Sequence, residues 1–331
     1  MTALLDDPPP WPGGPHDHGE RLASSHVEPA HVPHEVARHG GGGGVLGVGS
    51  PGKVGVLELG FELRGSRTEL VQHYQKAPLQ IMRPLYYDES RPDVPYTYLM
   101  TTGGGVLHGD RQRTDLRFGP GTASHTTTQA HTKLYRMEHG YATALLGIDA
   151  AEDAYVEYLP DPVIPFAGTR FYQRTHVTLH PSATLVLGDT LYAGRLSRDE
   201  RNEYDVYATD LAIERPGGRP VVVDRARLVP SAGRVGNLAV LDDRDIVATL
   251  YVVSPLAPAS VIADALHDAL GAVVAGGADD IRFGISALPG DTGAWVRLLG
   301  DDTVAMAAAL RTAWRTTREL LTGTPPSGIR K

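Results

Sequence analysis

Short segments in which apolar and polar residues alternate, with no helical pattern between them, most constrain the fold of this chain. In the first segment the alternating apolar residues are Leu57, Leu59, Phe61 and Leu63. A period of two is that of a strand with one buried face. Further strands are predicted at Thr97–Met100, Ala142–Ile148, Tyr155–Leu159, His176–Leu179, Thr184–Leu187, Tyr204–Ile213, Pro220–Val223, Val235–Leu241, Ile246–Val253 and Ile281–Ser286. Their succession predicts a mainly β fold, layered like a sandwich or wound as a β-helix, rather than a doubly wound α/β fold.

Two helices are predicted, both late in the chain. Residues Ala259–Leu270 place apolar side chains at helical spacing, and Gly271 is suited to end that helix. Residues Asp302–Thr322 repeat apolar residues at intervals of three, four and seven, with an acidic residue at the start and Gly323 at the end. The helical part of the fold is therefore expected to be small.

Residues 1–50 differ in composition from the rest of the chain, because they are rich in Pro, Gly and His and poor in aliphatic residues. Such a segment buries too little apolar surface to offset its ordering entropy. We therefore predict a disordered tail and linker over residues 1–50, one large β domain over residues 51–325, and a short C-terminal tail over residues 326–331.

Charge and cysteine content narrow the function. The formal net charge of −8 argues against nucleic-acid binding. With no Cys, any metal site must use His, carboxylate or backbone ligands. No apolar run approaches the length of a membrane span and no secretory signal is recognisable, so we expect a cytoplasmic protein without membrane contact.

One glycine-rich segment imitates a nucleotide-binding motif. Residues 47–52 match G-x-G-x-x-G and, with Lys53, nearly match a P-loop. A P-loop needs Ser or Thr after the Lys and a helix after the loop, whereas here Val54 begins a predicted strand. We therefore expect no nucleotide chemistry from this chain.

Several motifs together resemble the UreD family of urease accessory proteins. They extend over about residues 55–325, and their order and spacing carry the resemblance more than any single motif does. The motifs are Leu79–Tyr86, Tyr98–Asp110 with its Gly103-Gly104-Gly105 turn, Thr127–Arg136, Val156–Pro160, Ile164–Gly168, Gly194-Arg195 followed by Glu200, Gly217–Arg219 followed by Val223-Asp224, and the terminal helix with Trp314.

The resemblance implies a non-enzymatic scaffold for urease maturation. Proteins of this family bind UreF, which binds the GTPase UreG, and the assembly docks on apo-urease and passes nickel to its active site. The resemblance implies an internal, water-filled route for transient nickel(II), with no tightly bound cofactor. The rival interpretation is a hydrolytic or carbohydrate-active enzyme that uses Asp110 and Glu157 as paired acids.

Acidic residues in the family motifs are the candidates for a nickel route, because nickel accepts oxygen ligands and a route must release the ion. These candidates are Asp110, Glu157, Asp189 and Glu200. Asp110 follows a glycine and is also suited to hydrogen-bond a turn backbone. Glu157 lies in an apolar strand, where a carboxylate is exposed, paired or in contact with a hydrated channel.

Histidines form a second set of candidates. The N-terminal residues His16, His18, His26, His31, His34 and His39 offer imidazoles for weak nickel binding, although a merely solvated tail is an equal alternative. His108 and His131 lie in two separate motifs. If these motifs adjoin in the fold, the two imidazoles are candidates to bind nickel. A histidine beside a turn is more often only a hydrogen-bonding residue.

Arg83, Lys133, Tyr135 and Arg136 are candidates for a partner-binding surface, because Tyr and Arg are enriched in interface hot spots. The competing interpretation is that these residues pair with acidic groups of the same chain.

Overall fold

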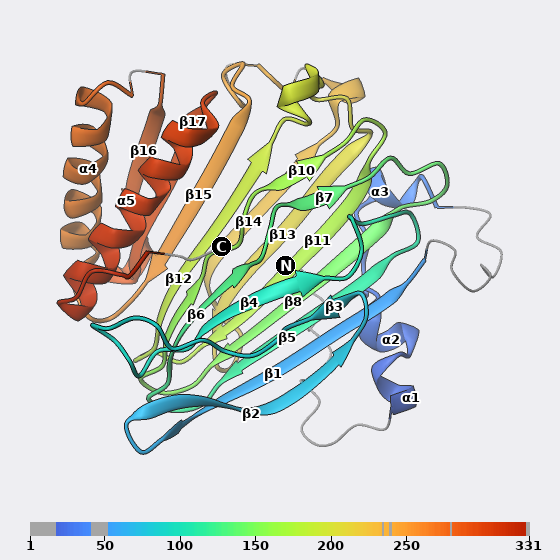
Figure 1. Cartoon of the computed structure of the whole chain (residues 1–331). Helices are drawn as coiled ribbons and strands as arrows, with labels where there is room; N and C mark the ends of the chain where they lie inside the picture. The colour runs from blue at the N-terminus through green and yellow to red at the C-terminus, as the bar shows by residue number, and fades with distance from the viewer. Residues whose placement is uncertain (1–17, 41–51, 234, 238–239, 279, 329–331) are drawn as a thin grey trace.

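The computed structural model describes residues 18–40, 52–233, 235–237, 240–278 and 280–328. Two sheets are stacked face to face, which confirms the prediction of a mainly β, layered fold (Figure 1). The first sheet has seven strands in the order β14-β13-β11-β8-β5-β1-β2. The second has ten strands, with the main order β16-β17-β15-β12-β9-β6-β4-β3, and β7 and β10 join beside β12.

The strand bounds are as follows. In the first sheet they are β1 (Val54–Arg64), β2 (Arg67–Lys76), β5 (Arg111–Phe118), β8 (Ala142–Ala150), β11 (Arg170–Leu179), β13 (Val206–Arg215) and β14 (Arg219–Leu228). In the second they are β3 (Leu79–Gln80), β4 (Tyr96–Thr101), β6 (Ala123–Thr128), β7 (Thr132–Leu134), β9 (Tyr155–Tyr158), β10 (Val163–Pro165), β12 (Thr184–Tyr192), β15 (Ile246–Val253), β16 (Arg282–Ala287) and β17 (Gly293–Gly300).

The middle of the molecule is wound like a solenoid. From β4 to β13 the chain passes from one sheet to the other and back, and successive strands within each sheet are parallel. Parallel neighbours usually need a crossover helix, but here the crossover is a strand of the other sheet. This winding explains why so many strands follow one another without helices.

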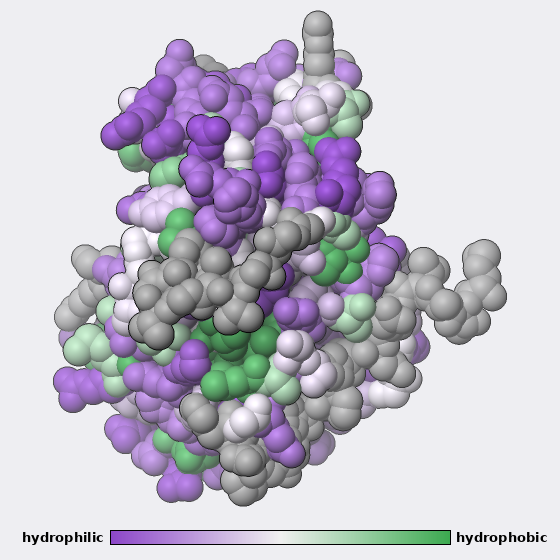
Figure 2. Space-filling model, turned by 90° about the vertical axis from the view of Figure 1, so that its right-hand side faces the viewer, coloured by the Kyte–Doolittle hydropathy of each residue, from purple (hydrophilic) through white to green (hydrophobic). Residues whose placement is uncertain are grey.

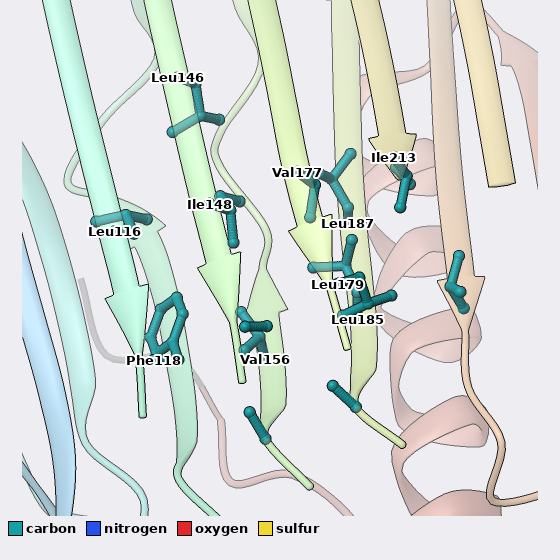
Figure 3. Close-up of a cluster of buried hydrophobic side chains, with 14 of the residues drawn as sticks. Leu116, Phe118, Leu146, Ile148, Val156, Val177, Leu179, Leu185, Leu187 and Ile213 are labelled. Carbon is teal, nitrogen blue, oxygen red and sulfur yellow. The ribbon is translucent and has the colours of Figure 1, made fainter. Parts of the chain in front are cut away.

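The main hydrophobic core lies between the two sheets (Figure 3). Leu116, Phe118 and Ile148 of the first sheet face Val156 and Leu185 of the second. Packing of these inward-facing side chains holds the two layers together. Leu63 continues the alternation of β1 in the sequence, but it is 45% exposed because it lies in the last, exposed residues of the strand.

Helices α4 (Ala259–Ala275) and α5 (Thr303–Thr322) lie side by side against one end of the ten-stranded sheet, over β15, β16 and β17 (Figure 1). Both predicted helices are confirmed, with one difference. Helix α4 continues past Gly271 and ends at Gly276, whose N–H bonds the carbonyl of Ala272. Helix α5 begins after Asp302, whose side chain accepts hydrogen bonds from two backbone N–H groups, as predicted.

The segment Val235–Leu241 was predicted as a strand, and that prediction is wrong. Its described residues form turns, and the N–H groups of Val240 and Leu241 bond the carbonyl of Asn237. Gly236, Asn237 and the following pair Asp242-Asp243 supply turn chemistry that overrides the apolar residues.

Residues 18–40 depart from the predicted disordered tail. They form three short helices, α1 (His18–Arg21), α2 (Ser24–Val27) and α3 (His34–Ala37), that lie against the seven-stranded sheet on the side away from the second sheet. Val27 and Val36 are buried there. The few aliphatic residues of this segment suffice because they dock on an existing surface instead of building a core. Among the described residues, no helix is long and apolar enough to cross a membrane.

Candidate functional site

A cavity opens between the two sheets beside the turn Gly103–Gly105. It has a volume of about 300 Å³ and is bounded by residues of both sheets, among them Gln112, Tyr158 and Gln173. The exposed residues Gly104 and His131 also line it, so the cavity reaches the surface. A side chain at Gly104 would place its Cβ 2.6 Å from the hydroxyl of Tyr135, so glycine lets this turn lie close over β7.

A second cavity, of about 370 Å³, lies farther along the same interlayer space. The two cavities share the lining residues Thr128, Thr132, Leu146, Tyr158 and Gln173. The second cavity also touches the exposed residue Val240 at the other side. The two cavities therefore adjoin, and their mixed polar and apolar lining extends from the Gly103–Gly105 turn to the region of Val240.

Asp189 is a partly buried carboxylate of the second cavity. It follows Leu187 on β12, and both residues face the first sheet. Burial and, to a smaller extent, the negative charge of Asp224 raise the pKa of Asp189 to about 6, against smaller opposing effects of Arg297 and of a hydrogen bond from the backbone N–H of Thr190. Protein surrounds the carboxylate on all sides, yet it keeps some accessible surface because the cavity is wide enough to admit water.

Asp224 of β14 reaches the same cavity from the opposite sheet. Its Oδ2 accepts hydrogen bonds from the hydroxyl of Tyr251 and from Nη2 of Arg297, the latter at 3.2 Å. Four aspartates line the cavity, Asp161, Asp189, Asp210 and Asp224, and of these Asp224 pairs with Arg297 and Asp210 with Arg227. Asp189 forms no ion pair with any residue that the structure describes. Sequence reasoning missed Asp224 as a site residue, although its family motif Val223-Asp224 was a usable signal.

Glu157 lies on the opposite face of the same sheet, beneath α5. It is fully buried. Its Oε2 is 2.8 Å from Nδ1 of His125, its Oε1 accepts a hydrogen bond from Tyr155 at 3.1 Å, and Oε1 is 3.6 Å from Nε of Arg318. Burial alone would raise the pKa of Glu157, but the hydrogen bond and charge of His125, with Arg318, lower it below the usual value. Of the three environments predicted for Glu157, the structure shows the paired one.

Arg318 joins Glu157 to a second buried acid. Its guanidinium donates to the hydroxyl of Tyr96 at 2.7 Å and lies 3.3 Å from Asp88. Burial disfavours ionised Asp88, but hydrogen bonds from Ser90, Ser327 and Tyr96 and the charge of Arg318 lower its pKa to about 2. We call this set (Asp88, Tyr96, His125, Tyr155, Glu157 and Arg318) the α5 cluster. It fastens α5 to the ten-stranded sheet.

Asp110 and Glu200 are structural carboxylates. Asp110 accepts hydrogen bonds from the backbone N–H groups of Gly52, Lys53 and Leu107, at 3.2, 2.8 and 2.9 Å, and so fixes the start of β1. Glu200 is paired with Arg195 and accepts the N–H of Ala167, and these contacts lower its pKa. Neither residue lines the interlayer cavities, so the predicted route is left with Asp189 alone of its four acids.

These positions also separate the two acids of the rival enzyme interpretation. The carboxylate oxygens of Asp110 accept hydrogen bonds from backbone N–H groups, and Glu157 is enclosed by the α5 cluster. They do not face a common cavity. The nucleotide-like motif lies largely outside the described residues, and after Lys53 the chain enters β1 without a helix.

The histidines are dispersed. His16 and the side chain of His18 lie outside the described residues. His26 lies 3.9 Å from Glu58, His31 and His34 are exposed, and the pKa of His39 is lowered by burial and by Arg170 and Arg38. In the described part of the chain, no three His, Asp or Glu side chains are grouped closely enough to hold a metal ion.

His108 and His131 have different neighbours. The ring of His108 lies 5.7 Å from that of His139, whereas the ring of His131 lies 5.7 Å from that of Tyr192. His131 borders the first cavity, and His108 does not. The structure therefore does not bring them together as a metal-binding pair.

Two of the four partner-surface candidates lie at the first cavity, because Lys133 lines it and Tyr135 contacts Gly104 of its turn, and the third, Arg136, follows them in the chain. Lys133 is exposed beside that cavity, Tyr135 packs on Phe166, and Arg136 is exposed against Gly168. Arg83 is exposed elsewhere, next to Met82, which is 82% exposed. Figure 2 shows the side of the molecule nearest β7 and α3 in Figure 1, where a hydrophobic area lies within a largely hydrophilic surface.

The fold and cavities define a class of protein: a solenoid-like β body with carboxylates lining a cavity between its two sheets. Residues 53–331 match the family model of the UreD urease accessory protein. The chain is 52% identical over 288 residues to urease accessory protein UreD 2 of Streptomyces griseus subsp. griseus, covering 86% of this chain and 96% of the relative. It is 33% identical over 279 residues to urease accessory protein UreD 3 of Methylorubrum populi, covering 84% and 88%. The chain belongs to the UreD family of urease accessory proteins.

Proposed function

We propose that this protein carries nickel(II) through its interlayer cavities to apo-urease, as a non-enzymatic scaffold of the cytoplasm. Family membership gives the accessory role in urease maturation. The observation that supports nickel passage is the pair of adjoining cavities with Asp189 in the farther one.

The chemistry of the lining suits passage better than storage. Carboxylate and water oxygens bind nickel(II) without the strength of several imidazoles. With its pKa near 6, Asp189 is mostly ionised at neutral pH and has no competing ion pair among the described residues. A divalent cation would offset the cost of that charge beside Asp224, and oxygen ligands would release the ion again more readily than several imidazoles would.

We propose that UreF binds this protein directly and that UreG binds through UreF. Lys133 and Tyr135 at the first cavity, with Arg136 next to them in the chain, are candidates for the surface at which one partner delivers or receives the ion. Nucleotide hydrolysis would then belong to UreG, because this chain has only an incomplete P-loop match.

The nickel content of urease tests the route. In cells that lack this protein, urease is expected to assemble without nickel, and the wild-type chain should restore it. Asp189→Asn should lower the nickel per urease by about tenfold, since loss of one oriented group typically costs that much in metal affinity. Asp264→Asn, an exposed acid of α4, is the matched control. Normal nickel content with Asp189→Asn would exclude Asp189 from the route.

Co-purification tests the partners separately. The tagged full chain should retain UreF and apo-urease, and Asp189→Asn should retain them equally. If neither partner is retained, the scaffold proposal fails, whatever the nickel result. If both partners are retained but the nickel content of urease is the same with Asp189→Asn as with the wild-type chain, only the route proposal fails.

A further inference from the structure

Residues 18–40, here called the N-terminal strap, lie outside the part of the chain that matches the UreD family model, which begins at residue 53. The strap crosses the outer face of the seven-stranded sheet (blue helices in Figure 1). Its helices α1, α2 and α3 have four residues each, and α2 and α3 have no side-chain cap. Helices this short are not stable alone in water, so their order depends on docking.

A buried ion pair holds the first part of the strap. Nε of Arg21 lies 3.0 Å from both carboxylate oxygens of Glu58 on β1, and the two side chains are only 13% and 7% exposed. The same guanidinium lies 4.2 Å from the centre of the Tyr74 ring. Glu58 points outward from the sheet, so without the strap this acid would face solvent.

A second polar contact fixes the middle of the strap. Arg113 of β5 donates from Nη1 to the carbonyl of His26 at 2.8 Å, while its Nε is held by Asp115 at 2.5 Å. Glu28 lies 3.5 Å from Arg111. The sheet therefore offers both an acid and oriented donors to a segment lying across it.

An apolar contact holds the end of the strap. Val36 of α3 is 0% exposed and packs with Tyr172, Val206, Ala208 and Val229, all on the outer face or its margin. Loss of the strap would expose this patch. A patch of this kind beside an acidic anchor is typical of a surface that binds another segment.

We propose that the outer face of the seven-stranded sheet is a binding site for a protein segment that combines a basic residue with aliphatic residues, and that the N-terminal strap is its built-in autoinhibitory occupant. The strap presents this chemistry as Arg21 and Val36. Because it is tethered, its effective concentration is high, and a partner segment must displace it. This inference is independent of the nickel route, since none of these residues lines the interlayer cavities.

The test uses the full chain and a labelled synthetic peptide of residues 18–40. In the double variant Arg21→Ala/Val36→Asp the tethered strap should be released, so the peptide should bind at least about tenfold more tightly than to the wild-type chain. The matched control Arg38→Ala/Ala37→Asp changes exposed residues of the same strap and should behave as wild type. A peptide carrying the Arg21→Ala and Val36→Asp changes should bind the double variant at least about tenfold more weakly.

Proteolysis gives a second measurement. Trypsin should cut after Arg38 faster in the double variant than in the wild-type chain, because the released strap is accessible. Circular dichroism should show that the β body is retained. If the double variant does not fold, Arg21→Ala alone supplies the same comparison. Equal peptide affinity for the wild-type and released chains, or no binding to either, would overturn the proposal.

Discussion

Two carboxylates on neighbouring strands of the ten-stranded sheet, buried Glu157 on β9 and partly buried Asp189 on β12, face opposite ways. Glu157 faces α5 and is paired with His125 and Arg318, so its pKa is lowered. Asp189 faces the first sheet across a cavity, and its pKa is raised to about 6. The same kind of side chain therefore fastens a helix on one face of the sheet and remains available to a cation on the other. The surroundings of each carboxylate decide which of these two roles it has.

The largest effect on stability is expected from removing the cation that pairs with Glu157. Arg318→Met would leave Glu157 and Asp88 buried without their shared cation and should lower the free energy of unfolding by about 3–5 kcal/mol. Urea denaturation at pH 7 measures this. Arg315→Met, an exposed position on the same helix, should change stability by less than about 0.5 kcal/mol. Similar losses for the two variants would contradict the role given to the α5 cluster.

Substitution of Asp189, which has no ion pair among the described residues, should change the free energy of unfolding in the opposite direction. Asp189→Asn is expected to raise the free energy of unfolding at pH 8 by about 1–3 kcal/mol, because wild-type Asp189 is ionised there against its burial. The unfolded-state pKa is near 3.8 and the folded one near 6, so wild-type stability falls as pH rises between them. The advantage of Asn should therefore grow from pH 4 to pH 6 and stay constant above.

Urea denaturation of both proteins at pH 4.5, 6 and 8 measures that difference, with Asp264→Asn as the control for an exposed charge. The pH dependence of stability that comes from Asp88 should have the opposite sign. Its lowered pKa means that its contribution to stability is present above pH 4 and is lost as pH falls towards 2. A destabilised Asp189→Asn at pH 8 would show that the Asp189 carboxylate is paired after all.

A smaller effect is expected at the start of α5. Asp302→Ala removes the side chain that accepts hydrogen bonds from the N–H groups of Val304 and Ala305, each at 2.8 Å, and should cost about 1 kcal/mol. Asp302→Asn keeps an acceptor and should cost only a few tenths. If the cap variant costs as much as Arg318→Met in urea denaturation, α5 is not held chiefly by its buried cluster.

The smallest effect should come from Glu200. Glu200→Gln retains an acceptor for the N–H of Ala167 but loses charge towards Arg195, whose side chain is 32% exposed, so we expect a loss of about 0.5 kcal/mol. Because Glu200 does not line the cavities, nickel content of urease should be unchanged. A clear fall in nickel content with normal stability would restore Glu200 as a route residue.

The sequence predicted the parts of the fold that depend on local pattern. Alternation located β1, β8 and β15, and helical spacing with caps located α4 and α5. It did not reveal β5, whose outward residues Arg113 and Asp115 are charged yet buried, because the strap that covers them comes from far away in the chain. For the same reason composition alone predicted a disordered tail for residues that dock on a sheet.

Site residues were predicted less well than strands. Asp110, Glu157 and Glu200 are all buried acids, and each is satisfied by contacts that no spacing rule reveals. Asp189 is the one predicted route acid that lines a cavity, and Asp224 meets it only because the two sheets are stacked, whereas Arg297 lies two strands away in the same sheet. Long-range contact, not residue type, separates the structural acids from the one in the cavity.

Gln173 lines both cavities, so it offers the most direct test of passage between the sheets. The nickel content of urease should be measured in cells whose own chain is replaced by Gln173→Trp or Gln173→Ala, with co-purified apo-urease as the control for docking. Gln173→Trp should narrow the cavities and lower the nickel content of urease, whereas Gln173→Ala should leave it at the wild-type level. Full nickel content with Gln173→Trp, on a folded chain that still binds apo-urease, would contradict the account.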